Sequence, residues 1–261
     1  MPIGDVQAGV PGCDEDKLRK HIEWGLEHNA YFIGMGDYVD MASPSDRRRL
    51  RSVEFYDPVT LAIQEKAEAD VERFLSLVEG SSGRWLGILE GHHYMEFPDG
   101  TTSDLRISKA LAAPFLGDMA IVTVHLADKK RKLSVPAKIW AFHGEGSTST
   151  EAGVITQLLR HKAAWEADVY LLGHHHKKVA TKKPRGESDE ADNLRMPEAI
   201  LAGTGSFLRG HMQDSRVDGR PGGAYPEQKG MPPVALGGVL IYMRPAVRED
   251  GSARLDLNVS L

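Results

Sequence analysis

Apolar residues recur along the chain with two different spacings. Leu18, Ile22 and Leu26 are four residues apart, which predicts a helix over residues 13–29 with one face toward a core. Similar patterns predict helices over residues 58–79, 105–116 and 151–165. Short apolar runs without this spacing predict strands over residues 2–3, 31–35, 85–89, 121–126, 133–142, 169–172, 179–180, 199–201, 239–242 and 255–259.

The order of these elements indicates the fold class. Strands alternate with helices in the first half, and strands dominate afterwards, which is typical of an α/β core with a partly antiparallel sheet. Residues 121–126 and 133–142 are expected to form a hairpin around a charged turn at 128–132. We expect a single domain over residues 1–261, with a variable loop region at about 182–233 that is polar at its start and rich in Gly and Pro at its end.

Composition and charge narrow the function classes. The 261 residues are 41% hydrophobic and 26% charged, which is ordinary globular composition rather than that of a disordered chain. A net charge of -5 gives no global attraction to nucleic acid, so any polyanion contact needs a local basic patch. The single Cys13, the absence of an apolar run of spanning length and the lack of a leader-like segment before Asp5 favour a soluble, cytoplasmic protein without membrane contact.

Five short motifs rich in carboxylates and imidazoles follow the predicted strands in order. Because strand ends gather at one edge of an α/β sheet, this spacing predicts a shared site. Its oxygen and nitrogen donors suit divalent metals. The motifs are Asp5-Val6-Gln7, Gly36-Asp37-Tyr38-Val39-Asp40, Gly91-His92-His93, His143-Gly144 and Gly173-His174-His175-His176.

From Asp5 to His176 the chain resembles the calcineurin-like metallophosphoesterase superfamily. The pattern of that superfamily is Asp-x-His, Gly-Asp-x-x-Asp, Gly-Asn-His-(Asp/Glu), a lone His, and Gly-His-x-His. The resemblance implies a four-layer α/β/β/α sandwich, in which helices flank two packed mixed β-sheets. It also implies a phosphoesterase with two divalent metal ions, hydrolysing phosphate esters by attack of a metal-bridging hydroxide.

The resemblance also implies a role for each matching residue. Asp37 would bridge the two metals, His93 would act as general acid at the leaving oxygen, and Asp40 would orient His93. The alternative register, with His92 catalytic and His93 a ligand, stays open. The implied ligands are Asp5, Gln7, Asp37 and His176 for the first metal, and Asp37, His92, His143 and His174 for the second.

Two positions depart from the superfamily pattern. Gln7 stands where His is usual, and His92 stands where Asn is usual. One metal site is therefore oxygen-rich and the other nitrogen-rich, and we expect the Gln7 site to bind more weakly and to prefer Mn²⁺ or Mg²⁺. Mn²⁺ is the expected cofactor, with Mg²⁺, Fe and Zn²⁺ as alternatives.

Other polar clusters have competing interpretations. Arg47 and Arg48, which follow Asp40, are candidates for contact with a polyanionic substrate or for a solvated face. The basic turn at 129–132 precedes the strand that ends at His143, so it lies at the opposite end and is expected to be solvated. Residues 147–150 indicate an ordinary helix N-cap, with a phosphate-binding helix terminus as the alternative.

These observations favour phosphodiesters of nucleotides or nucleic acid, including single-stranded nucleic acid, as substrates. The alternatives are a pyrophosphatase of nucleotide conjugates such as ADP-ribose, and a non-catalytic scaffold with the same fold. Retention of His93 speaks against the scaffold, because the resemblance implies that scaffold members usually lose this catalytic His. The sequence leaves the oligomeric state open.

Overall fold

The computed structural model describes residues 1–41, 57–130, 132–188, 192–212, 216–217, 220–221, 227, 230–248 and 251–261. Its helices are α1 (Glu15–Glu27), α3 (Asp57–Leu77), α4 (Ser103–Ala110) and α5 (Glu151–Ala164). Side-chain caps fix where several of them begin: Asp14, Thr102 and Thr150 accept hydrogen bonds from backbone N–H groups in the first turns of α1, α4 and α5. Thr150 confirms the ordinary N-cap expected at residues 147–150.

The first sheet is parallel throughout, whereas a mixed sheet was expected. Its strands are β1 (Pro2–Ile3), β2 (Phe32–Gly34), β3 (Trp85–Leu89) and β4 (Phe115–Gly117), paired in the order β1-β2-β3-β4. Crossovers containing α1, α3 and α4 connect these strands, as parallel neighbours require. The carboxyl ends of all four strands therefore lie at one edge.

The predicted helix over residues 105–116 is wrong at its end. α4 stops at Ala110, Ala112 has a left-handed backbone with φ 52°, and β4 begins at Phe115. Pro114 explains the break, because it lacks an N–H and disfavours helical backbone at the residue before it.

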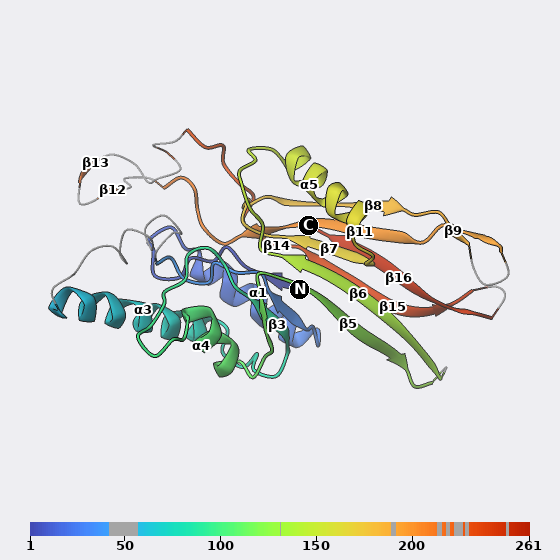
Figure 1. Ribbon diagram of the computed structural model, residues 1–261, viewed down its shortest axis with the longest axis horizontal. Coiled ribbons are helices and arrows are strands. Elements are labelled where there is room, and N and C mark those ends of the chain that lie inside the picture. Colours follow the sequence, from blue (N-terminus) through green and yellow to red (C-terminus); the bar gives the residue numbers. More distant parts are fainter. Residues whose placement is uncertain are drawn as a thin grey trace.

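The second sheet is mixed and has the order β14-β11-β7-β6-β5, with β8 also paired to β11. Neighbours β6, β7 and β11 run parallel, and the remaining pairs are antiparallel. Its strands are β5 (Met119–Asp128), β6 (Leu133–Phe142), β7 (Val169–Leu172), β8 (Lys178–Pro184), β11 (Glu198–Ser206) and β14 (Gly237–Gly238). A separate hairpin of β15 (Leu240–Val247) and β16 (Ala253–Ser260) lies against β5 and β6 (Figure 1).

The expected loop region at about 182–233 is only partly loop. The long strand β11 lies within it because residues 199–206 are buried, and residues 200–203 pair on both sides, with β7 and β8. Two short antiparallel pairs also fall there: β9 (Glu187–Ser188) with β10 (Leu194–Arg195), and β12 (Arg216–Val217) with β13 (Arg220–Pro221).

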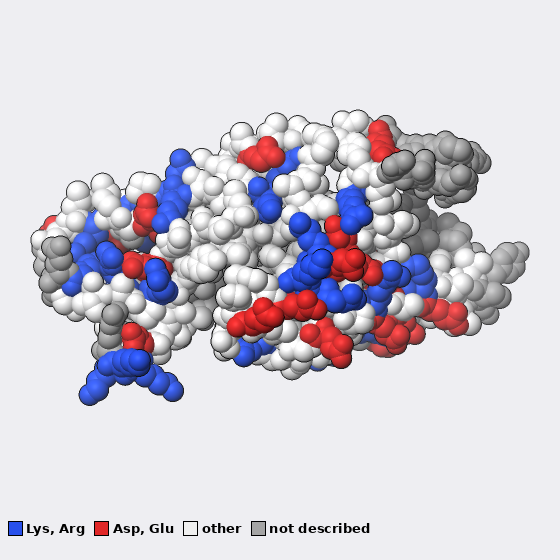
Figure 2. Space-filling view, turned by 180° about the vertical axis from the view of Figure 1, so that it is seen from behind, with Lys and Arg blue, Asp and Glu red and all other residues white. Residues whose placement is uncertain are grey.

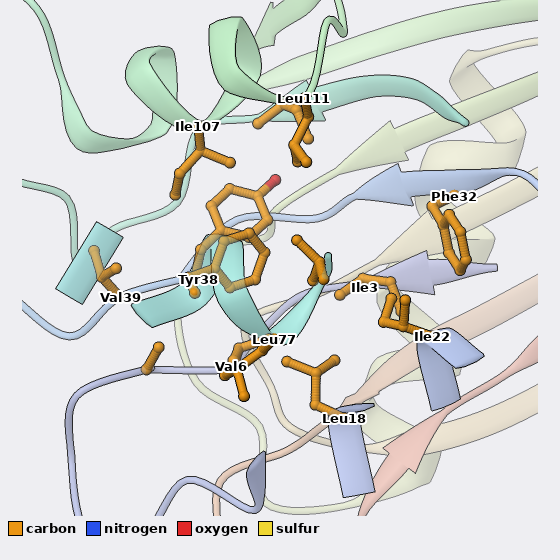
Figure 3. Close-up of a cluster of buried hydrophobic side chains, with 14 of the residues drawn as sticks. Ile3, Val6, Leu18, Ile22, Phe32, Tyr38, Val39, Leu77, Ile107 and Leu111 are labelled. Carbon is orange, nitrogen blue, oxygen red and sulfur yellow. The ribbon is translucent and has the colours of Figure 1, made fainter. Parts of the chain in front are cut away.

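Strand side chains alternate between two buried clusters on the faces of the first sheet. Phe32 and Ile88 pack with the helices α1, α3 and α4, in the cluster shown in Figure 3. Ile33 and Leu89 point the other way, into a cluster shared with β6, β7 and β11 of the second sheet. A third cluster lies between α5 and the opposite face of the second sheet. The mixed α/β class expected from the sequence is confirmed.

The β5–β6 hairpin projects from the body of the protein. Lys129, Lys130 and Lys132 at its turn are exposed. Figure 2 shows Lys and Arg side chains at this projecting end, at the lower left when the protein is viewed from behind. Among the described residues, no helix is both long and apolar enough to cross a membrane.

Candidate metal centre

Loops at the carboxyl ends of five strands converge on one site. Asp5 and Gln7 follow β1, Asp37 and Asp40 follow β2, and His92 and His93 follow β3. His143 follows β6, and His174 and His176 follow β7. The facing edges of the two sheets therefore supply the side chains together, which explains why the motifs are so far apart in the sequence.

The backbone at this site is held in a sparsely populated conformation. The described residues include nine non-glycine positions with positive φ, and five of them carry candidate ligands. A non-glycine residue in this backbone conformation costs about 1–3 kcal/mol of stability. Five such residues at one place therefore indicate that their side chains have a function. These residues are Asp5 (φ 49°), Gln7 (51°), Asp37 (52°), His174 (65°) and His176 (55°).

Backbone hydrogen bonds lock the first two loops together. The N–H groups of Val6 and Gln7 both donate to the carbonyl of Asp37, at 2.9 and 3.0 Å, and Asp5 N–H donates to Gly36 O at 3.0 Å. Gln7 itself is 6% exposed. Hydrogen bonds of the main chain therefore fix the positions of the Asp5 and Asp37 carboxylates without the help of a bound metal.

His92, His143 and His174 form a nitrogen-rich group whose ligand atoms lie within 4.8 Å of one another. The Nδ1 atoms of His92 and His174 are 3.3 Å apart. Burial and the neighbouring imidazoles lower the pKa of both rings, that of His92 to about 4. These two rings are therefore neutral near pH 7, the form in which imidazole binds a metal.

His143 is oriented by the main chain. Its Nδ1 lies 2.6 Å from Met35 O, so Nδ1 carries the proton and donates to that carbonyl. The Nε2 atom is buried, has no hydrogen-bond partner and faces Asp37 Oδ2 at 3.3 Å. A neutral ring would place a lone pair against a carboxylate there, so the arrangement requires either a proton on Nε2 or a metal cation bound by both atoms.

Protonation of His143 can supply that positive charge. Burial alone would lower the pKa of His143, but the carboxylates of Asp37 and Asp5 and the hydrogen bond to Met35 together outweigh burial and raise it to about 9. His143 in turn holds the pKa of Asp37 well below its usual range, against the effect of burial. A divalent ion would satisfy both atoms and displace the proton.

Asp5, Asp37 and His143 form an oxygen-rich group, also within 4.8 Å. Asp5 Oδ2 accepts from the N–H of His174 at 3.0 Å, whereas Oδ1 is buried without a hydrogen-bond partner, 3.4 Å from His176 Nε2. Burial, reinforced by Asp37, raises the pKa of Asp5 to about 7. No described Lys or Arg forms an ion pair with either carboxylate, so the buried negative charge has no protein cation beyond histidine.

The structure groups the ligands differently from the sequence assignment. The two candidate groups share His143, whereas the resemblance made Asp37 the shared residue. Both residues lie between the groups, since Asp37 Oδ2 is next to His143 Nε2. The donor set fits divalent metals that accept oxygen and nitrogen, and the unpartnered Asp5 Oδ1 and His143 Nε2 are its clearest open positions.

His93 and Asp40 stand beside this cluster as a pair. His93 Nδ1 is 2.7 Å from Asp40 Oδ1, and the two side chains are 30% and 32% exposed, in contrast to His143 at 2%. Burial lowers the pKa of His93, but the hydrogen bond to Asp40 and the negative charges of Asp37 and Asp40 together outweigh burial, so the net shift is upward. His93 is therefore a solvent-reachable imidazole that holds a proton more readily than an ordinary histidine.

A supporting residue, Asp104, was not identified from the sequence. Its buried carboxylate accepts from Gly91 N–H at 2.8 Å and from the Ser103 hydroxyl at 3.1 Å, which fixes the loop that carries His92 and His93. In that loop the N–H groups of His92 and His93 donate to Asp37 Oδ1, at 2.5 and 3.0 Å. The only signal near Asp104 in the sequence was the helix predicted to begin directly after it, at residue 105, and that signal does not indicate a contact with Gly91.

The remaining expectations fall outside the cluster. His175 Nε2 is 3.0 Å from Gln157 Oε1, and His175 belongs to neither metal group. Arg47 and Arg48 lie outside the described residues. The other histidines also belong to neither group: His21, His28, His125, His161 and His211.

Comparisons with known proteins give little beyond this geometry. No family model matches the chain, and no curated protein matches it. Among solved structures, the crystal structure of Chaetomium thermophilum Vps29 is similar at 11% sequence identity and a TM-score of 0.32, covering 99% of this chain and 93% of that one. At that TM-score the functional argument rests on the site itself.

Proposed function

We propose that this protein is a dinuclear-metal-dependent phosphoric ester hydrolase of the calcineurin-like type, acting on phosphodiesters of nucleotides or nucleic acid. One observation carries the proposal: two buried ligand atoms without partners, Asp5 Oδ1 and His143 Nε2, lie in one Asp/His cluster. An enzyme without a metal would gain nothing from burying two carboxylates among histidines in strained backbone.

We propose that the cluster supplies the two ligand sets that the resemblance implies, although by distance alone the two groups of potential ligands share His143 rather than Asp37. The first set is Asp5, Gln7, Asp37 and His176, and the second is Asp37, His92, His143 and His174. When bound, two divalent cations would neutralise the phosphate ester and lower the pKa of water so that hydroxide forms near neutral pH. The chain's contribution is to fix the ligands before binding, through the backbone hydrogen bonds among Asp5, Gln7 and Asp37.

The His93–Asp40 pair supplies the proton that the leaving oxygen needs. Asp40 occupies Nδ1 of His93, which leaves Nε2 as the atom that donates to the leaving group. The hydrogen bond to Asp40 favours the protonated ring and so keeps this proton available. Exposure of His93 lets a substrate reach it, whereas the ligand His143 is sealed from solvent.

The packing of the sheets supports the proposed sandwich fold. Ile33 and Leu89 of the first sheet share a buried cluster with the second sheet, and helices cover the opposite face of each sheet. We propose that these layers form the four-layer α/β/β/α arrangement, which would explain why ligands from β1–β3 and from β6–β7 meet at one end.

Hydrolysis of an aryl phosphodiester, bis(4-nitrophenyl) phosphate, with and without Mn²⁺ tests the proposal. Wild-type protein should show Mn²⁺-dependent turnover of this ester. On a dinucleotide, whose leaving alkoxide needs a proton, His93→Ala should reduce kcat by about 100-fold or more, the usual contribution of general acid catalysis. His125→Ala is the matched control, because His125 is exposed on β5 away from the cluster. Background rates for both the wild type and His93→Ala would leave a scaffold and end the hydrolase proposal.

A substrate panel then separates the classes of ester. The proposal expects faster turnover of cyclic nucleotides or single-stranded DNA than of a phosphate monoester. Preferential cleavage of ADP-ribose would instead assign the site to pyrophosphates of nucleotide conjugates.

A further inference from the structure

A large cavity lies at the end of the strands opposite the metal centre. Its volume is about 860 Å³, within the range of small-molecule sites. It is lined by Pro2 of β1, Leu86 near the start of β3, Val169 at the start of β7, and the beginning of β15. The cavity is therefore separated from the Asp/His cluster by the length of the strands.

The lengths of the strands explain why this space is open. β1, β2 and β3 have two, three and five residues, whereas β5 and β6 have ten each. The first sheet thus covers only part of the second, and the β15–β16 hairpin covers another part (Figure 1). The cavity lies where the first sheet meets the β15–β16 hairpin, and its lining residues include Ile139 and Leu171 of the second sheet.

The lining suits an apolar body. Most of it is aliphatic, and aromatic side chains join from three elements. Trp24 is stacked on His28 with ring centroids 4.0 Å apart, and Tyr31 and Tyr242 are 53% and 43% exposed. Large aromatic rings left this open to solvent beside an apolar hollow mark a binding surface.

The charge of the lining selects the polar end of the ligand. Among the residues that the structure describes, no Asp or Glu lines the cavity, although the chain has 37 acidic residues and a net charge of -5. Arg244 lines it and forms no ion pair among the described residues, because its cross-strand neighbour Asp256 pairs with Arg254 at 3.0 Å. Asn258 is the cross-strand partner of Tyr242 and adds an amide donor on the same hairpin.

We propose that this cavity binds a small amphipathic anion: a hydrocarbon or aromatic body carrying one carboxylate. The body lies on the partly buried apolar side chains along the opening, such as Leu86, Val124 and Ile241, above a floor of closely packed core residues. The carboxylate meets the Arg244 guanidinium, whose planar donor pair matches carboxylate geometry. This site is distinct from the metal centre and does not depend on the proposed hydrolase activity.

Calorimetric titration with straight-chain carboxylates tests the proposal on the full chain. Decanoate should bind with a stoichiometry of one, and octanoate, two methylenes shorter, should bind roughly tenfold more weakly. Arg244→Gln should weaken decanoate binding about tenfold and leave binding of decanol unchanged. Arg160→Gln is the matched control, because Arg160 is exposed on α5 and does not line the cavity.

A second variant tests occupancy of the space without altering charge. Ala127 is exposed and lines the cavity, so Ala127→Trp should fill the mouth and reduce binding of both decanoate and decanol. Unsaturable uptake of many ligands per chain, or equal decanoate affinity in Arg244→Gln and wild type, would overturn the proposal. A concentration-dependent dimer in sedimentation velocity that Ala127→Trp abolishes would assign the cavity to a second copy of the chain and would also overturn it.

Discussion

Substitution of Gly91 by alanine gives the sharpest prediction for the metal centre. A Cβ at Gly91 would lie 2.1 Å from Asp37 N and 2.3 Å from Asp37 Oδ1. Cβ atoms essentially never come closer than 3.0 Å to such atoms, so the backbone of Asp37 has to retreat by the difference, about 0.9 Å. The clash is with main chain as well as side chain, so a rotamer change alone does not relieve it.

The displacement acts on several ligands at once. Asp37 Oδ1 accepts from the N–H groups of His92 and His93, so its movement also loosens the loop that carries both imidazoles. Misplacement by roughly 1 Å commonly costs about 100-fold in catalysis, and loss of support around a metal site costs 10- to 100-fold in affinity. We therefore expect Gly91→Ala to weaken Mn²⁺ binding by about 100-fold.

Calorimetric titration with Mn²⁺ measures this loss, with circular dichroism to establish that the variant is folded. Gly186→Ala is the matched control, because the nearest atom to its added Cβ is Met196 Sδ at 3.7 Å. A folded Gly91→Ala protein with wild-type Mn²⁺ affinity would show that Asp37 is not held where the account requires it.

Three further predictions concern support of the site and stability. Asp104→Ala removes the acceptor of Gly91 N–H and should weaken Mn²⁺ binding 10- to 100-fold in calorimetry, whereas Asp104→Asn keeps an acceptor and should retain most of the affinity. Burial lowers the pKa of His21 to about 4, so the unfolded chain takes up a proton at higher pH than the folded protein does. The free energy of unfolding should therefore fall by at most about 3 kcal/mol as the pH drops from 6.5 toward 4. In urea unfolding, His21→Leu should lose less of its free energy of unfolding than the wild type over the same pH range. Leu158→Ala, at a fully buried position, should destabilise the protein by about 3 kcal/mol in the same assay, whereas its 41%-exposed neighbour Leu159→Ala should change stability by less than about 0.5 kcal/mol.

Apolar runs in the sequence correctly predicted the bounds of several strands. The strands at Trp85–Leu89, Leu133–Phe142 and Val169–Leu172 have the bounds that their apolar runs predicted. The predicted helix is too long because the apolar residues after Ala110 continue a helical spacing across Pro114, whereas the proline prevents the helix from continuing. The parallel order of the first sheet depends on pairing between strands far apart in the sequence, which no local pattern records.

At the metal centre, too, the sequence predicted what depends on local pattern and missed what depends on tertiary packing. Strand ends predicted which residues gather, and the structure brings Asp5, Asp37, His92, His143 and His174 together. The shared position of His143 could not be predicted, because it depends on how the edges of two sheets face each other. Asp104 was missed for a similar reason, since its partner Gly91 is a backbone N–H that has no distinct sequence signal.

Equilibrium binding of Mn²⁺ to chelator-treated wild-type protein, followed by calorimetry near pH 7, tests the central claim most directly. The account predicts two ions per chain with unequal affinities, the weaker one at the Gln7 side, and loss of both in Asp37→Asn. Absence of saturable binding, or an unchanged isotherm in Asp37→Asn, would contradict the assignment of the Asp/His cluster as a metal centre.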